Sequence, residues 1–185
     1  MTPTRKTKLD ESIYNNVEQM QAVQQMLDQC VTLHAGEEYA ELGVFLGYLQ
    51  GLAMIHQAHH WQTMGTNYYA DHLLFQRLYE ETSPEIDVVA EKLVGASGGV
   101  QMTNYFSQMH HMKTFMLAIS HRQPLATESL LAEVSLVLCG ELVMDRLQQK
   151  GILTRGIEQA LGNVLDKHES HIYLLQQRAN GPIAK

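Results

Sequence analysis

The segment EEYAELGVFLGYLQGLAMIHQAHHWQTM, residues 37–64, has the clearest structural pattern in the chain. Its apolar side chains recur at steps of three and four residues, which is the period of one face of an α-helix. The last two residues of that face are histidines. The face consists of Leu42, Phe45, Leu46, Leu49, Leu52, Ala53, His56 and His60. We therefore predict a long helix whose last turns place imidazoles on the side that packs into a core.

Helical patterns also fill most of the remaining chain. Apolar steps of three and four, separated by glycine, proline and threonine turn signals, predict helices over residues 9–34, 68–93, 103–120, 127–149 and 154–178. Almost none of these segments alternates as a β-strand does. The predicted fold class is all-α, a four-helix bundle with an extra N-terminal helix and a helix in the middle connection. The four bundle helices are residues 37–64, 68–93, 127–149 and 154–178.

Length and composition agree with a single globular domain. The chain has 185 residues, 45% of them hydrophobic, and single domains commonly run to about 100–200 residues. We predict one domain over residues 9–180. Residues 1–8 contain Arg5, Lys6 and Lys8 but no acid, which is typical of a short mobile basic tail.

Charge and cysteine content argue against several functional classes. The net charge of −7 disfavours a wholly basic nucleic-acid-binding surface. Cys30 and Cys139 occur without a C-x-x-C pair, so neither a disulfide framework nor a thiolate zinc site is predicted. No apolar run approaches the ~18 residues of a membrane helix, and no secretory signal is recognisable, which predicts a soluble cytoplasmic protein. The ten histidines are the feature that needs an explanation.

One local pattern interrupts the helix predicted over residues 68–93. Ser83-Pro84-Glu85 is a good helix start, with serine as the N-cap and proline at the first position. Either the helix bends at Pro84, where the missing N–H removes one backbone hydrogen bond, or the segment is two helices.

Several familiar metal and catalytic motifs are missing. The usual di-iron bundle uses Glu-x-x-His pairs, in which residues i and i+3 project inward together, and no glutamate here has a histidine three residues later. We therefore predict no self-contained di-iron site. H-E-x-x-H, the phosphate-cradling glycine loop and the Gly-x-Ser-x-Gly elbow are also absent, which argues against zinc proteases, P-loop proteins and hydrolases with that elbow.

Ligand-type residues do gather on two neighbouring predicted helices. His56 and His60 lie on one, and His72, Asp87 and Glu91 share roughly one face of the next. At 1.5 Å per residue, His72 is about 22 Å from Asp87 and about 28 Å from Glu91 along a continuous helix. They cannot bind one ion within one chain. Antiparallel packing across a two-fold axis would bring the histidine end of one chain to the carboxylate end of its mate.

At these positions the chain resembles the Dps family, the miniferritins or DNA-binding proteins from starved cells. The resemblance runs through HWQTMGTNYYADH at residues 60–72, DVVAEK at residues 87–92 and Gly98-Gly99. It implies a ferritin-like four-helix subunit, a hollow dodecamer and iron bound at dimer interfaces. It also implies that Fe(II) is oxidised there, typically with hydrogen peroxide, and that ferric mineral is stored inside.

The resemblance implies roles for individual residues as well. His60 and His72 would bind iron from one chain, and Asp87 and Glu91 from its partner. Trp61 would flank the site as an aromatic that intercepts oxidising by-products.

The chain also departs from the family's pattern. Gln76 stands where the family usually has an aspartate, and a neutral amide there would weaken or abolish a second iron position. Gln76 and His56 are therefore predicted to lie next to the ligands rather than to be ligands. Lys92 replaces a customary arginine, which keeps the charge but not the bidentate geometry.

The other histidines receive weaker predictions. His59 is predicted to face solvent or a subunit contact. His110 and His111 lie between Met109 and Met112; the alternatives are an additional metal site, such as one for copper, and a methionine-rich packing helix, of which the packing helix is predicted. His168 and His171, spaced i and i+3 like half of a metal site, are predicted to lie on a solvated or interface patch.

Two functional hypotheses of different classes follow. The first is a miniferritin ferroxidase that removes Fe(II) and peroxide together, stores ferric iron in a hollow homo-oligomer and protects DNA from oxidative damage. The alternative is a Dps-like shell or DNA-packing scaffold with a degenerate iron site, in which the basic tail makes weak, non-specific and salt-sensitive contacts with DNA. Neither hypothesis involves a membrane.

Overall fold

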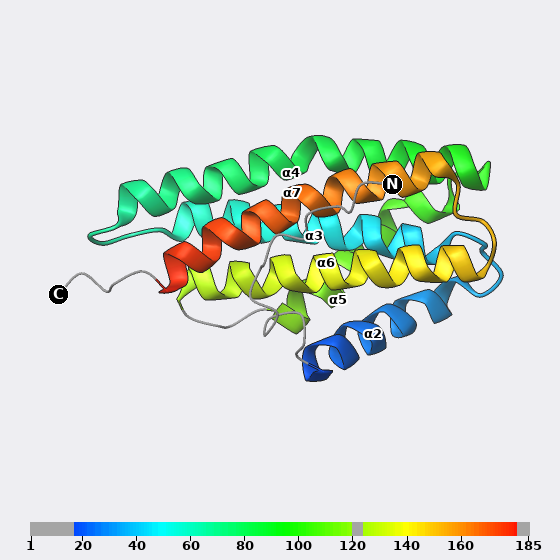
Figure 1. Cartoon of the computed structure of the whole chain (residues 1–185), viewed down its shortest axis with the longest axis horizontal. Helices are drawn as coiled ribbons and strands as arrows, with labels where there is room; N and C mark the ends of the chain where they lie inside the picture. Colours follow the sequence, from blue (N-terminus) through cyan, green and yellow to red (C-terminus); the bar gives the residue numbers. More distant parts are fainter. Residues whose placement is uncertain (1–16, 120–123, 181–185) are drawn as a thin grey trace, which may run out of the picture.

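The chain is helical throughout the part that the computed structural model describes, residues 17–119 and 124–180 (Figure 1). That part has no strand and six α-helices: α2 (Val17–Val31), α3 (Ala40–Gln62), α4 (Tyr68–Ser97), α5 (Tyr105–Ile119), α6 (Leu125–Gln149) and α7 (Arg155–Asn180). Two single-turn 3₁₀ helices, η1 (Thr32–His34) and η2 (Gln101–Thr103), precede α3 and α5. The all-α prediction is confirmed, while the predicted tail of residues 1–8 lies outside the described residues. None of the described helices is long and apolar enough to cross a membrane.

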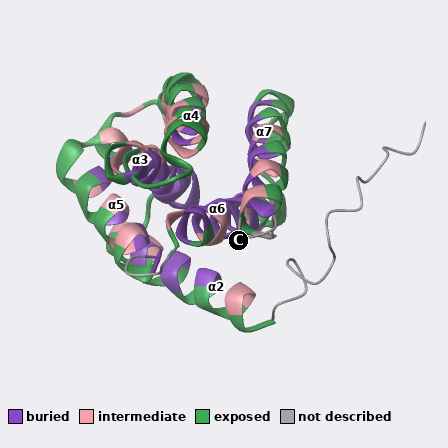
Figure 2. Cartoon of the chain, turned by 90° about the vertical axis from the view of Figure 1, so that its left-hand side faces the viewer, coloured by how far each residue is buried: buried purple, intermediate pink, exposed green. Residues whose placement is uncertain are grey.

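Four of the helices surround a common centre, which Figure 2 shows nearly end-on. α3 packs against α4 and α6, and α7 contacts the same two helices from the opposite side. The remaining two helices form an outer layer, in which α5 packs on α3 and α2 packs mainly on α6. The core therefore extends in two directions, into the bundle and under the outer layer. This arrangement is compatible with the predicted four-helix bundle and its two additional helices.

Burial on all sides sets α3 apart from an ordinary amphipathic helix. Every residue from 40 to 49 is buried, because the bundle covers one side and α5 covers the other. A helix that is apolar all round is expected in such a position. Close approach of α5 depends on a glycine: a Cβ added at Gly47 would lie only 2.4 Å from Cβ of His111.

α4 runs through Pro84 as one continuous helix, so the alternative of two separate helices is wrong. Proline has no N–H to donate to the carbonyl four residues earlier. Hydroxyls beside it bond to carbonyls of the preceding turn: Thr82 Oγ1 donates to the Leu78 carbonyl at 2.7 Å and Ser83 Oγ to the Tyr79 carbonyl at 2.8 Å. Such bonds favour a local bend without ending a helix. α4 ends at Gly98, whose φ of 65° is the left-handed conformation of a helix C-cap.

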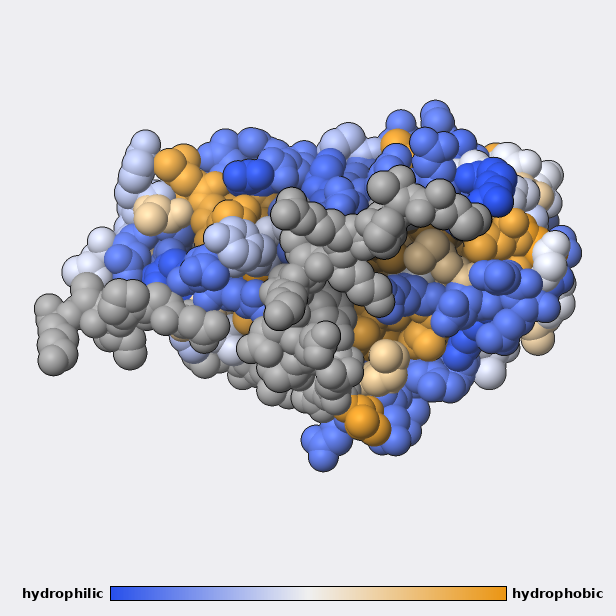
Figure 3. Space-filling model, viewed as in Figure 1, coloured by the Kyte–Doolittle hydropathy of each residue, from blue (hydrophilic) through white to orange (hydrophobic). Residues whose placement is uncertain are grey.

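The surface is mostly polar, with apolar side chains interspersed (Figure 3). Exposed large apolar side chains concentrate near the turn between α3 and α4, where Trp61 is 70% and Tyr69 73% exposed. Met64, Tyr68 and Leu73 are exposed in the same stretch. Contiguous exposed apolar groups are typical of contact surfaces between proteins.

Candidate metal centre

A carboxylate lies inside the bundle among the apolar side chains of α6. Glu133 is fully buried, and each of its oxygens contacts imidazoles from other helices. Its Oε1 is 2.8 Å from Nε2 of His56 on α3 and 3.0 Å from Nδ1 of His171 on α7. Its Oε2 is 2.6 Å from Nδ1 of His168, also on α7. One buried carboxylate thus organises three fully buried imidazoles.

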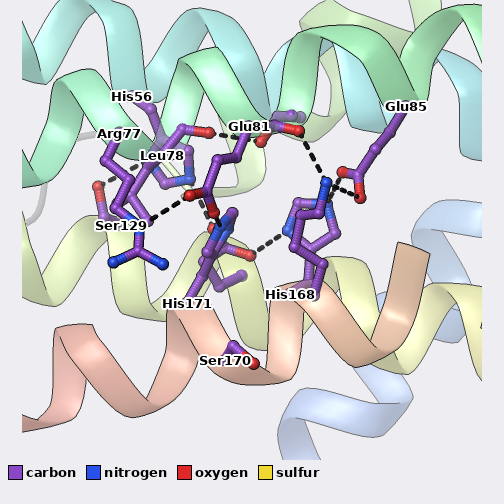
Figure 4. A network of polar contacts seen from close by, with 12 residues as sticks. His56, Arg77, Leu78, Glu81, Glu85, Ser129, His168, Ser170 and His171 are labelled. Carbon is purple, nitrogen blue, oxygen red and sulfur yellow. Dashed lines mark hydrogen bonds and ion pairs between the residues drawn. The ribbon is translucent and has the colours of Figure 1, made fainter. Parts of the chain in front are cut away.

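Two carboxylates of α4 face the same imidazoles from the other side (Figure 4). Oε2 of Glu81 lies 3.0 Å from Nε2 of His171, and Oε2 of Glu85 lies 3.1 Å from Nε2 of His168. The sequence spacing explains the match, because residues four apart on α4 and three apart on α7 are each separated by one helical turn. Each α7 imidazole is therefore held between Glu133 and one carboxylate of α4. We call these six residues the bundle cluster: His56, Glu81, Glu85, Glu133, His168 and His171.

The bundle cluster contains a buried ion pair. Burial alone would raise the pKa of Glu133, but the charge of His168 and the hydrogen bonds from all three imidazoles hold the pKa well below 4.5. Burial would lower the pKa of His168, yet Glu133 and Glu85 raise it to about 9. At His56 burial prevails over Glu133, and its pKa falls below 6.5. At neutral pH the metal-free protein thus holds an ionised Glu133, a protonated His168 and a neutral His56.

Two buried atoms of the bundle cluster lack a hydrogen-bond partner among the described residues. Nε2 of His168 and Oε2 of Glu85 are 3.1 Å apart and form an ion pair when His168 is protonated, although they do not make a hydrogen bond. The other oxygen of Glu85 is 3.2 Å from Nζ of Lys167. Buried polar atoms without partners are uncommon in folded proteins and call for an explanation. A nitrogen and a carboxylate oxygen that face each other in this way are suited to share a cation.

The donor set fits a transition-metal ion. One ligand atom from each of Glu133, His168 and His171 lies within 4.8 Å of the others, which is close enough for one ion. Combined imidazole and carboxylate ligands suit iron, and zinc less specifically. Metal binding would displace the extra proton of His168, as is usual for imidazole ligands. Glu81 and Glu85 lie at the opposite edges of these rings, at Nε2 of His171 and His168, and are not part of this three-residue group.

A row of hydrogen bonds extends from the bundle cluster toward the end of α3. Oγ of Ser129 on α6 is 3.2 Å from Nδ1 of His56 and 2.7 Å from Nδ1 of His59. Nε2 of His59 in turn lies 3.4 Å from Oε1 of Glu128. The row fixes the ring of His56 against Glu133. The prediction that His59 faces solvent or a subunit contact is wrong, because this residue is only 3% exposed.

The placement of His168 and His171 differs most from the sequence-based expectation. Both are completely buried, so the predicted solvated or interface patch is wrong. The sequence also predicted no self-contained di-iron site, since Glu-x-x-His pairs are absent, yet one chain does gather a His/Glu cluster of its own. This cluster could hold a metal ion, but nothing tests whether it is a di-iron site, so that prediction stays open. The Glu-x-x-His motif does not describe the cluster, because its carboxylates and imidazoles come from different helices. A lone Glu133 within an apolar run, and the i, i+4 and i, i+3 pairs on α4 and α7, were the available signals.

His60 and His72, the predicted ligands from one chain, do lie together. Their rings stack with centroids 3.7 Å apart. Nδ1 of each ring is hydrogen-bonded to the backbone carbonyl of the other residue, at 2.9 and 3.0 Å. With Nδ1 engaged as a donor, each ring keeps Nε2 as its possible metal-binding atom. Tyr68 stacks on His72, and Tyr79 meets His60 edge to face.

The remaining predicted site residues are not brought to this histidine pair within the chain. Asp87 and Glu91 are exposed farther along α4, so they could complete a site only from a second chain, as predicted. Trp61 is exposed next to His60. Gln76 donates to Glu80 at 2.8 Å on the surface of α4. His56, predicted as a neighbour of the histidine pair, instead contacts Glu133 in the bundle cluster.

Comparison of the sequence with known protein families and with curated proteins finds no match. The functional argument therefore rests on the chemistry of the bundle cluster and of the histidine pair.

Proposed function

We propose that this protein is a ferritin-like miniferritin that binds Fe(II) in the bundle cluster, oxidises it, and stores ferric iron within a hollow homo-oligomer. The observation that carries the proposal is a fully buried Glu133 joined to three buried imidazoles, with two carboxylates of α4 opposite. A buried ionic cluster of this size is a poor way to gain stability, since apolar residues of similar volume often serve equally well. Strongly perturbed pKa values of Glu133 and His168 also mark candidate functional sites.

Five residues of the bundle cluster would take different roles in binding the substrate Fe(II). His168 and His171 bind through nitrogen, and Glu133 binds or orients both rings. Glu81 and Glu85 supply the anionic oxygens that favour the Fe(III) product over Fe(II). The side chain of Glu81 is 36% exposed, which makes the α4 side the approach route for the ion.

The oxidation balances with hydrogen peroxide as the oxidant. Each Fe(II) loses one electron, and two such ions supply the pair that breaks the O–O bond of one peroxide. With two protons this yields two waters and two Fe(III). The protein's own contribution is to hold the ions in an anionic, largely water-excluded centre and to accept or supply protons through its imidazoles.

Glu81→Gln and Glu85→Gln test the proposal. Each change keeps the side-chain volume but removes an anionic ligand, so we expect the rate of peroxide-driven Fe(II) oxidation, followed by ferric absorbance, to fall at least about tenfold. Glu80→Gln is the matched control, because Glu80 is an exposed carboxylate on the same helix and should leave the rate unchanged. If both variants oxidise Fe(II) as fast as the unaltered chain, the reaction does not take place at the bundle cluster.

A second location for the same chemistry is favoured by the stacked histidine pair. His60 and His72, each anchored through Nδ1, present their outer nitrogens near the exposed start of α4. In this version Asp87 and Glu91 of a second chain complete the site. His72→Gln and Glu91→Gln would then abolish oxidation while Glu81→Gln would not, so the two sets of variants separate the two locations.

A further inference from the structure

Three histidines outside the bundle cluster come together in the outer layer. His34 is the last residue of η1, directly after α2, while His110 and His111 lie on α5. Nε2 of His34 is 3.0 Å from Nε2 of His111, with ring centroids 5.0 Å apart. The ring of His110 is centred 5.9 Å from that of His111. None of them contacts the bundle cluster or the stacked histidine pair through a contact that the structure describes.

We infer that His34 and His111 form a second metal site, separate from the bundle cluster, that binds a divalent transition-metal ion with a preference for imidazole, such as Zn²⁺. The facing Nε2 atoms carry the inference. In the metal-free protein one hydrogen atom must lie between them, because two bare lone pairs would repel each other. A metal ion can take the place of that hydrogen and bind both nitrogens.

The distance between the two nitrogens is close to what such an ion requires. Two nitrogens bound to one tetrahedral zinc at about 2.0–2.1 Å are about 3.3 Å apart. The observed separation is 3.0 Å, so the rings need to part only slightly. His110 is exposed and next in sequence to His111, but among the described residues the three rings do not bring one nitrogen each within 4.8 Å of the others. His34 and His111 are therefore the two protein ligands, and water would complete the coordination.

Of the two proposed ligands, His111 has the side chain that packing holds in place. It is completely buried, and its Cβ lies where a side chain at Gly47 of α3 would otherwise be. His34 is half-buried, so its ring can adjust to an ion that His111 positions. Glu37 adds a negative charge close to His34.

The surroundings predict the class of metal and its strength of binding. Mg²⁺ and Ca²⁺ need oxygen ligands, whereas a pair of facing imidazoles suits Zn²⁺, Cu²⁺ and Ni²⁺. Nδ1 of His111 has no hydrogen-bond partner among the described residues, so this ligand lacks the outer support that strengthens many histidine–metal bonds. We expect weaker binding than at a carboxylate-supported site. A bound ion would tie the end of α2 to α5 and stabilise the outer layer.

Titration of the full-length chain with Zn²⁺, after removal of metals by chelation, tests the inference. His34→Gln keeps a polar, half-exposed side chain but removes one ligand, so the affinity for one ion per chain should fall at least about tenfold. Glu38→Gln, an exposed neighbour in the same connection, is the matched control. The double variant Glu81→Gln/Glu85→Gln should lose binding at the bundle cluster and keep this ion.

The same variants separate this inference from the proposed function. His34→Gln should leave the rate of Fe(II) oxidation unchanged and should remove nitrogen couplings from the paramagnetic resonance spectrum of bound Cu²⁺. His111→Gln should have the same effect on the spectrum, and if it does not fold, the half-exposed His34 still provides the test. Zn²⁺ isotherms and Cu²⁺ spectra of His34→Gln that match those of the unaltered chain would overturn the site.

Discussion

The side chain of Glu133 is fully buried. All residues of α6 from Ala132 to Gly140 are buried as well. Glutamate is almost never fully buried unless it is paired. Here the pairing is with His56, His168 and His171, which hold the pKa of Glu133 well below its usual range despite burial. Removing one member would leave buried charge or unmatched polar atoms behind, which is costly. The cluster therefore acts as a unit at the residue scale.

The pKa of His168 predicts how the stability of the metal-free protein depends on pH. The folded pKa of about 9 lies above the ordinary value of 6.5, so the stabilisation is complete below pH 6.5 and is lost as pH rises through 9. At 1.36 kcal/mol per pH unit this is about 3 kcal/mol. Urea unfolding at pH 6.5, 8 and 9.5, with a chelator present, measures it. Glu133, whose folded pKa is depressed, keeps its contribution throughout this window.

Two histidine variants serve as controls for this pH dependence. His168→Gln should be less stable at pH 6.5 and should lose most of the dependence between pH 6.5 and 9.5. His110→Gln, at an exposed position on α5, should keep it. An unaltered chain whose unfolding free energy does not fall over this range would contradict a protonated His168.

At the scale of elements, α3 joins the bundle to the outer layer because glycines line the side that α5 covers. Gly43, Gly47 and Gly51 recur every fourth residue and lie against Met102, His111 and Phe115. The periodicity of Leu42 to His60 predicted the bundle-facing stripe, but no apolar pattern marks a second buried face made of glycines. That face appears only when another helix packs against it.

Gly47→Ala tests this close packing. The added Cβ would lie 2.4 Å from Cβ of His111, a short and stiff contact, so α3 and α5 must separate. We expect a loss of about 1–3 kcal/mol in the unfolding free energy, measured by urea denaturation. Gly162→Ala on α7 is the matched control, since nothing lies within 4 Å of the new Cβ. At position 162 the higher helix propensity of alanine should stabilise the protein by up to about 1 kcal/mol. If the two substitutions change the unfolding free energy equally, the close packing of α3 on α5 is contradicted.

At the scale of the whole molecule, we predict self-assembly from the exposed apolar residues around the α3–α4 turn. They include Trp61, Met64 and Tyr69 and lie beside the stacked pair of His60 and His72. Burying such a group in a contact between chains removes apolar surface from water. The same contact surface would place a second chain near the histidine pair.

The mass of the protein in solution tests this assembly. A dodecamer of 20.9 kDa chains would have a mass of about 250 kDa, which light scattering coupled to size exclusion measures directly. We expect a large, discrete oligomer. A strict monomer would contradict the hollow shell and leave His60 and His72 without carboxylates from a second chain, but it would not affect the bundle cluster.

The helices themselves were largely predictable from the sequence. The helices predicted over 37–64 and 127–149 are α3 and α6. The ends of α3 differ from the prediction by three and two residues, the start of α6 differs by two, and its end is unchanged. This accuracy is expected because apolar periodicity and turn residues are local properties. The bounds of α4 were less accurate: the predicted end near residue 93 moved to Ser97, where Gly98 supplies the left-handed cap. Pro84 did not end the helix, since tertiary packing can hold a proline-containing helix together.

By itself the sequence determined the all-helical class, the approximate helix bounds and the presence of histidines on core-facing positions. Only the tertiary structure decided which histidines meet which carboxylates. His168 and His171 of α7 meet Glu133 of α6 on one side and Glu81 and Glu85 of α4 on the other. Spacing along a chain describes one helix face at a time, whereas a ligand cluster depends on the order and register in which separate helices pack.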